Sequence, residues 1–171
     1  TELFKETGAF QVATLCPALP YGLFDCEVSH ATKEQKANGK VVFDGIVEMA
    51  KGNIAHGVPV GLGTDTACPF VTQYDMWREL DFYGKYCGVS NAFALYTGTL
   101  LNATLAGVGD VTGSIEVGKC ADMIVTKKNP LDNLSVLRHV QMVVKEGVVY
   151  DHPQVKKIPE VEAEMDKFNR V

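Results

Sequence analysis

An aspartate that follows a short apolar segment is the side chain in this sequence best placed to do chemistry. Residues 58–62 are apolar and bounded by glycines, which is typical of a strand buried on both faces. The segment runs into Gly63, Thr64 and Asp65, so it delivers a carboxylate to the C-terminal end of the predicted strand. In a parallel α/β barrel, catalytic groups lie at that end of the strands. On this stretch alone, however, the favoured role of Asp65 is to cap a turn, because Asp and Thr are ordinary turn residues.

The composition excludes several classes of protein. Of 171 residues, 46% are hydrophobic and 22% charged, which is typical of one globular domain, or of one domain with a small appendage. A net charge of -5 without a cluster of Lys or Arg argues against nucleic-acid binding. No apolar run is long enough to span a membrane, and no signal peptide is recognisable. Five cysteines without regular spacing indicate free thiols in a reducing compartment, so we expect a cytoplasmic protein.

The first half of the chain predicts one βαβ unit, whose two strands should be parallel neighbours. The long segment between its first strand and its helix carries two prolines, and loops of that length are usually functional or lid-like. The predicted elements are a helix over 2–7, a strand over 10–15, a loop over 16–30, a helix over 33–54 and the strand over 58–62.

The second half predicts helices and then a small antiparallel β unit. Ser90 suits a helix N-cap, and Pro159 suits the first position of a last helix. The charged side of that last helix is expected to face solvent, with Glu160, Glu162, Glu164, Asp166 and Lys167 on it. The predicted elements are helices over 72–86, 90–96 and 100–106, strands over 113–119 and 121–125, a hairpin over 140–150 and a helix from 159.

Several of these pieces, taken in order, resemble the C-terminal part of a metal-dependent amidohydrolase, most closely the imidazolonepropionase and prolidase-type branch. The Gly-Thr-Asp motif at Asp65 is weak by itself. The run from Gly113 to Val125 is much more specific. The matching pieces are Gly63-Thr64-Asp65, Thr97, Asn102-Ala103, Gly113 to Val125, Asn129-Pro130-Leu131 and Val143 to Val149.

The resemblance implies an α/β fold, namely the C-terminal portion of a (β/α)8 barrel with half of a small β-sandwich. The implied organisation is a partial barrel over 1–107 with strands seven and eight, a sandwich segment over 108–152, and a linker with a C-terminal helix over 153–171. A whole barrel needs about 200 residues or more, and the family's His-x-His pair does not occur here. Because the chain also begins at Thr1, inside what reads as a helix, we expect it to be a fragment of a longer enzyme.

The resemblance also implies the chemistry. Asp65 would be a ligand of a divalent metal, zinc by expectation, and would shuttle a proton while a metal-activated water hydrolyses a C–N bond of an amide, lactam or peptide-like substrate. Thr66, His30, Tyr21 and Phe70 are weaker candidates for substrate binding, at the same end of the barrel. One carboxylate cannot hold a catalytic zinc, so we expect the isolated chain to be inactive and to bind no metal by itself.

His56 lies in the same stretch as Asp65 but at the other end of the strand, on the order of 20 Å away. It is better placed as a helix C-terminal histidine beside Gly57.

Two other readings stay open. The chain could be a non-catalytic α/β module that associates into a homo-oligomer through exposed sheet edges. It could also be a complete, smaller α/β sheet without metal chemistry.

Overall fold

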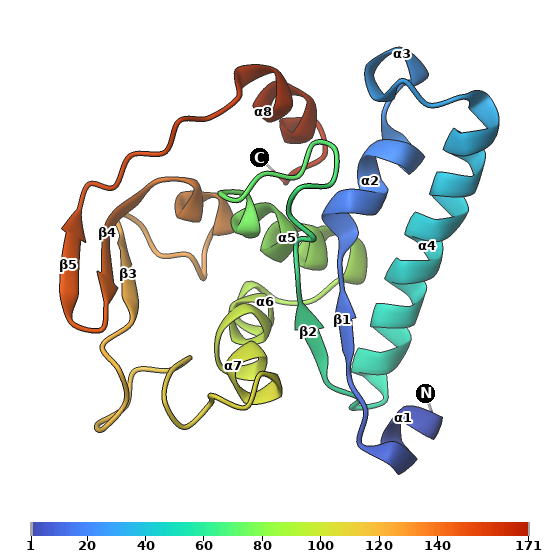
Figure 1. Ribbon diagram of the computed structural model, residues 1–171. Coiled ribbons are helices and arrows are strands. Elements are labelled where there is room, and N and C mark those ends of the chain that lie inside the picture. Colours follow the sequence, from blue (N-terminus) through green and yellow to red (C-terminus); the bar gives the residue numbers. More distant parts are fainter. Residues whose placement is uncertain (1, 171) are drawn as a thin grey trace.

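The computed structural model describes residues 2–170 of the chain. Two β-sheets lie apart from each other with helices around and between them (Figure 1). A parallel pair, β1 (Gln11–Ala13) and β2 (Val60–Leu62), lies beside the long helix α4 (Lys33–Ala55). A three-stranded antiparallel sheet forms the opposite side, and the described residues therefore form a mixed α/β structure.

The predicted βαβ unit is confirmed. Strands β1 and β2 pair in parallel, with Gln11 opposite Val60 and Ala13 opposite Leu62. α1 (Glu2–Thr7) precedes them, and the connection between them contains α4 and, before it, two shorter helices. A capping box starts α4, because the Thr32 hydroxyl accepts from the Gln35 amide while the Gln35 side chain accepts from the Thr32 amide.

The end of α4 is also as predicted for His56. This residue is the C-cap of α4, its Nδ1 lies 2.7 Å from the Gly52 carbonyl oxygen, and Gly57 follows with φ of +74°.

The predicted loop over 16–30 is wrong. These residues form α2 (Leu15–Leu23) and α3 (Cys26–Ser29). Pro17 lies in the first turn of α2, where its missing amide hydrogen costs nothing, and Pro20 lies inside the helix. Gly22 and Gly39 let α2 and α4 touch at backbone distance, since a Cβ on Gly39 would lie 2.7 Å from the Tyr21 carbonyl carbon.

The helices after β2 are interrupted by two π-helical turns. α5 (Met76–Phe82) continues into a π turn over Tyr83–Cys87, and α6 (Asn91–Tyr96) continues through a second π turn (Thr97–Leu101) into α7 (Asn102–Leu105). Ser90 caps α6 as predicted, accepting from the Phe93 amide.

The C-terminal sheet has the order β3–β4–β5, formed by β3 (Met123–Thr126), β4 (Val140–Lys145) and β5 (Val148–Asp151). The predicted hairpin is confirmed. The predicted strand over 113–119 is wrong: this segment forms turns, and its Ile115 and Val117 are 83% and 108% exposed, with no strand beside them in the described part of the chain.

The last helix, α8 (Pro159–Asp166), begins at Pro159 as predicted. Glu160 and Lys167 are exposed as expected, but the charged face as a whole is not solvated. Glu162 is only 7% exposed, and α8 lies against α5 through ion pairs to Arg78. Glu162 and Asp166 therefore attach α8 to α5 and do not form a solvent-exposed face.

A single cluster of apolar side chains joins the helices and the parallel strands, and includes Leu15, Phe24, Phe43, Phe82 and Met165. No helix within residues 2–170 combines the length and the apolar character that a membrane span requires.

Candidate functional site

The segment between β2 and α5, residues 63–75, carries the predicted catalytic aspartate and is called the Asp65 loop below. The loop begins at the last hydrogen bond of the parallel pair, from the Gly63 amide to the Ala13 carbonyl at 3.2 Å. Asp65 therefore follows the C-terminal end of β2, as the sequence predicted, and its side chain is exposed.

Within the loop, Asp65 contacts Cys68. The Cys68 thiol donates to Asp65 Oδ2 at 3.3 Å, and the Cys68 amide donates to the Asp65 carbonyl at 3.2 Å. The thiol's hydrogen bond to the carboxylate is the main reason why the pKa of Cys68 lies above its ordinary value. Beside this pair, the hydroxyls of Thr64 and Thr66 lie 2.9 Å apart. The tip of the loop is thus a small polar cluster facing solvent.

The backbone of this loop is unusual. Three residues other than glycine have positive φ: Asp65 at +52°, Ala67 at +89° and Phe70 at +66°. Each such residue costs on the order of 1–3 kcal/mol, so the surroundings must hold the loop in this shape.

The other predicted site residues, Tyr21, Phe70 and His30, lie in three different environments. Tyr21 and Cys68 line one apolar cavity of about 470 Å³ between α2 and α4. The Phe70 ring packs edge-on against Phe24, at 4.9 Å between centroids, and so turns toward the core. His30 is exposed at the C-terminal end of α3.

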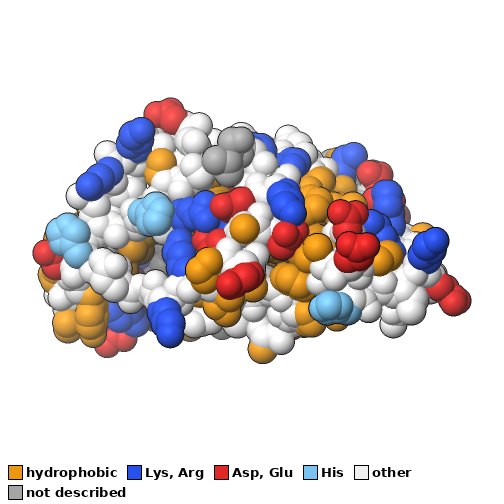
Figure 2. Space-filling view, turned by 90° about the horizontal axis from the view of Figure 1, so that it is seen from above, with side chains coloured by type: hydrophobic (Ala, Val, Ile, Leu, Met, Phe, Trp, Pro, Cys, Tyr) orange, Lys and Arg blue, Asp and Glu red, His pale blue; other side chains and the backbone are white. Residues whose placement is uncertain are grey.

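Figure 2 views the molecule from above, the end of Figure 1 at which the Asp65 loop lies. Hydrophobic side chains gather right of the centre, bordered by acidic and basic groups. The surface of the described residues at this end shows no expanse of one charge.

Two side chains to which the sequence assigned no role at the site fix β2. The Asn102 side-chain amide donates to the Leu62 carbonyl at 2.7 Å, and its oxygen accepts from the Leu62 amide at 2.9 Å. The Tyr83 hydroxyl donates to the Gly61 carbonyl at 3.0 Å, and burial raises the pKa of this phenol. Asn102 is part of the motif that carried the resemblance, but its contact with a strand 40 positions away could not be read from the motif.

A buried glutamate fixes the helix that follows β1. Glu79 is fully buried, and its two carboxylate oxygens accept from the amides of Leu15 and Cys16 at 2.5 and 2.8 Å. These are the first amides of α2, so Glu79 caps that helix from α5. Burial raises the pKa of Glu79 to about 7, while the hydrogen bonds from Cys16 and Leu15 oppose the rise.

The described side chains around Asp65 are too few to hold a metal ion by themselves. Across residues 2–170, no group of three or more His, Cys, Asp or Glu side chains is placed to hold one. The Asp65 carboxylate accepts a hydrogen bond from the Cys68 thiol, and a catalytic zinc usually takes three protein ligands. The described residues therefore do not form a complete metal site by themselves.

Comparison with known families shows the family of this chain. The model of the amidohydrolase family matches residues 44–150, more than half of the sequence. The chain belongs to the amidohydrolase family. The match spans β2, the Asp65 loop, α5 to α7 and the antiparallel sheet, so the resemblance noted in the sequence is confirmed.

Relatives within the amidohydrolase family are prolidase-like proteins and ochratoxinase. A crystal structure of a candidate prolidase from Bifidobacterium longum superposes with a TM-score of 0.90 at 39% identity, over 93% of this chain and 39% of that one. A Xaa-Pro dipeptidase, solved with methionine in its active site, matches with a TM-score of 0.69 at 30% identity, over 88% of this chain and 36% of that one. Ochratoxinase from Aspergillus niger is 31% identical over 160 residues, which is 90% of this chain.

The amidohydrolase chain described here spans about a third of the length of ochratoxinase, since the alignment covers 32% of that protein. The parts of the relatives outside this alignment have no counterpart in the 171 residues. The two parallel strands are a portion that an α/β barrel would contain, whereas the barrel itself and the boundaries at 107/108 and 152/153 stay predictions.

Proposed function

We propose that the protein to which this chain belongs is a hydrolase of amide or peptide-like C–N bonds, and that Asp65 is its proton-transferring carboxylate. The observation that carries the proposal is the position of Asp65, an exposed carboxylate on the loop after a parallel strand, in a chain that belongs to the amidohydrolase family. The relatives named as a Xaa-Pro dipeptidase and a prolidase solved with N-methylphosphonate-L-proline favour Xaa-Pro dipeptides as the first substrates to test.

The chemistry assigned to Asp65 is a two-step proton transfer. As a water oxygen bonds to the carbonyl carbon of the substrate, the carboxylate accepts the proton that the water loses. As the C–N bond then breaks, the same carboxyl group donates that proton to the leaving nitrogen. The thiol of Cys68, 3.3 Å from Asp65 Oδ2, holds the carboxylate in place between the two steps.

A metal would supply a water of lowered pKa in such a reaction. Ligation by Asp65, which the family resemblance implies, needs further ligands from outside the residues described here. Thr66, His30 and Tyr21 are proposed to contact substrate around Asp65, and Phe70 to support the loop from the core side.

The test compares two substitutions in the protein as its gene encodes it and in the 171-residue chain. Hydrolysis of Xaa-Pro dipeptides is measured with added zinc or manganese. We expect Asp65→Asn to lower kcat by about a hundredfold or more, because the amide cannot take up the proton. Asp132→Asn, an exposed aspartate far along the chain, serves as the control and should leave kcat unchanged. Full activity of the Asp65→Asn protein would refute the role of Asp65.

A second candidate function rests on the antiparallel sheet. All four residues of the edge strand β5 are exposed, among them Val148, Val149 and Tyr150 at 54–56%. We propose that this module self-associates through that edge. Sedimentation velocity should then show a mass that increases with concentration, and Val149→Lys should reduce it. A chain that stays monomeric at the highest attainable concentration would exclude the proposal.

A further inference from the structure

The C-terminal segment, residues 159–170, reaches the Asp65 loop by two independent routes. The first route is aromatic. The Phe168 ring stacks on Phe24, with 5.2 Å between centroids and planes 15° apart, and Phe24 meets Phe70 of the Asp65 loop edge-on at 4.9 Å. Phe24 is 2% exposed and belongs to the core, while Phe70 and Phe168 are partly buried and pack against it from two sides. Movement of Phe168 therefore removes one face of the packing that supports the loop.

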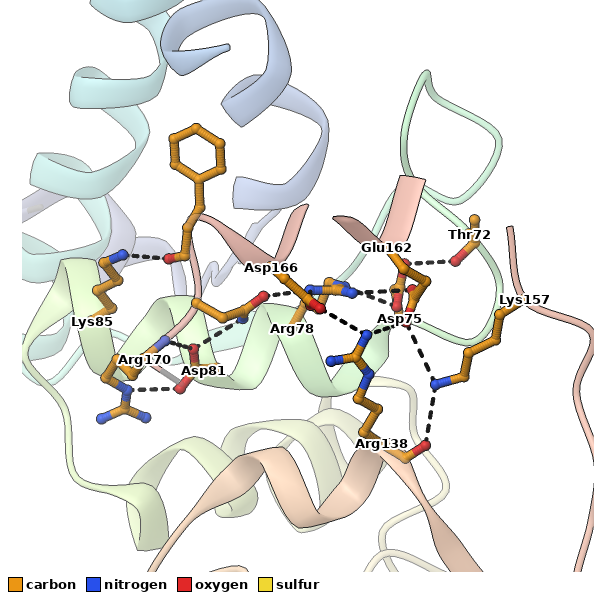
Figure 3. Close-up of polar contacts among 12 residues, drawn as sticks. Thr72, Asp75, Arg78, Asp81, Lys85, Arg138, Lys157, Glu162, Asp166 and Arg170 are labelled. Atoms are coloured by element: carbon orange, nitrogen blue, oxygen red, sulfur yellow. Dashed lines mark hydrogen bonds and ion pairs between the residues drawn. The ribbon is translucent and has the colours of Figure 1, made fainter. Parts of the chain in front are cut away.

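The second route is polar and is drawn in Figure 3. The Arg78 guanidinium on α5 is fully buried and donates to Asp75 Oδ1 at 3.0 Å, at the end of the Asp65 loop. The other oxygen of Asp75 accepts from the Thr72 hydroxyl at 2.6 Å, which fixes the last turn of the loop.

Arg78 depends in turn on the C-terminal segment. Its remaining donors reach Glu162 Oε1 at 3.0 Å, Asp166 Oδ1 at 2.7 Å and Asn169 Oδ1 at 2.5 Å. A buried guanidinium without these acceptors would be poorly compensated, because a buried charge needs both an ion pair and hydrogen bonds. Without them the guanidinium would no longer be held at its present position, so its hydrogen bond to Asp75 would no longer fix the end of the Asp65 loop.

The loop needs support from outside it. Its three residues with positive φ are strained even though hydrogen bonds within the loop join them to their neighbours, among them the bond from the Val71 amide to the Cys68 carbonyl at 3.0 Å. Conformations of this kind persist only where the surroundings determine them.

We propose that the C-terminal segment positions the Asp65 loop, with Phe168 and Arg78 as positioning residues that act on Asp65 through Phe70 and Asp75. The inference rests on the proposed function in treating Asp65 as the reacting group. In physical terms, the segment selects one conformation of the loop. When the segment leaves, the loop populates others and Asp65 loses its fixed place.

Hydrogen–deuterium exchange of the 171-residue chain tests this without any need for activity. The reporters are the Cys68 and Val71 amides, which carry the hydrogen bonds inside the loop. Phe168→Ala should speed their exchange by about three- to tenfold, the loss expected for one aromatic pair. Phe168→Tyr keeps the ring and should restore slow exchange. Val161→Ala, a partly buried position of α8 outside the row of rings, is the matched control and should leave the reporters unchanged.

Glu162→Gln provides a second variant that keeps the size of the side chain and weakens the polar route. It should also speed exchange at Val71. Faster exchange of α8 itself, with unchanged exchange at Cys68 and Val71 in both variants, would overturn the proposal. Hydrolysis is measured separately: a loop that loosens in a protein without any hydrolytic activity would count against the proposed function and leave the positioning role supported.

Discussion

Glu79 gives the sharpest prediction, because its buried carboxylate should make folding depend on pH. Its pKa is about 7 in the folded chain and has the ordinary value of 4.5 once unfolding exposes it. The folded state therefore holds this proton more tightly. Stability from this group is fully present below pH 4.5 and is lost as the pH rises toward 7, since the ionised form is costly to bury.

The size of the effect follows from the pKa difference. A rise from 4.5 to about 7 corresponds to a loss of about 3 kcal/mol over the whole range. Between about pH 5 and about pH 8 the loss is about 2.5 kcal/mol. Other groups act in the opposite direction. Burial raises the pKa of Glu162, but Arg138 and Arg78 outweigh it and hold the pKa below the ordinary value, so that ion pair is weakened at low pH.

Glu79→Gln separates these contributions. Glutamine keeps one acceptor for the amides of Leu15 and Cys16 and stays neutral, so it loses about 1 kcal/mol of hydrogen bonding at every pH. Urea unfolding of both proteins at about pH 5 and about pH 8 gives the difference in free energy of unfolding. We expect this difference to shift by about 2–3 kcal/mol in favour of the variant at the higher pH. Glu48→Gln, at an exposed glutamate, is the control.

A difference that does not change with pH would refute the reasoning, because Glu79 would then have the same pKa in both states. A shift in favour of the wild type at high pH would mean that the two amides of α2 stabilise the ionised form more than burial penalises it.

Three further outcomes are expected. Arg78→Met should lower the free energy of unfolding by about 3–5 kcal/mol in urea titrations, because it strands buried carboxylates, whereas Lys40→Met at an exposed pair should cost less than about 1 kcal/mol. Asn102→Ala removes two hydrogen bonds to the Leu62 backbone and should cost about 2–3 kcal/mol by the same measurement; a neutral result would show that solvent replaces them. Asp65→Ala should speed alkylation of the Cys68 thiol near neutral pH, since the carboxylate is the main cause of its raised pKa, and an unchanged rate by mass spectrometry would contradict that.

The sequence predicted the elements whose signals are local. The apolar spacing of α4, the Ser90 cap and the turn between β4 and β5 each depend on residues a few positions apart. The position of Asp65 after a buried strand was predicted for the same reason.

The elements that sequence reasoning missed depend on distant partners. Two prolines suggested a loop at 16–30, but α2 starts there because Glu79, more than sixty positions away, accepts its first amides. The residue pattern suggested a strand at 113–119, but among residues 2–170 no strand lies beside this segment to complete a sheet. The charges of α8 suggested a solvated face because Arg78 is far away in the sequence.

The order in which the chain folds follows from the same separation. Three of the side chains that accept hydrogen bonds from the Arg78 guanidinium lie 84 to 91 positions after it in the sequence. Closing so long a loop is entropically costly, and a chain is synthesised from its N-terminus, so these contacts form after those among residues 11–87. Until residues 162–169 arrive, a nascent chain carries on α5 a cation with Asp75 beside it and most of its donors open to water. α5 therefore completes its burial only when residues 162–169 are present.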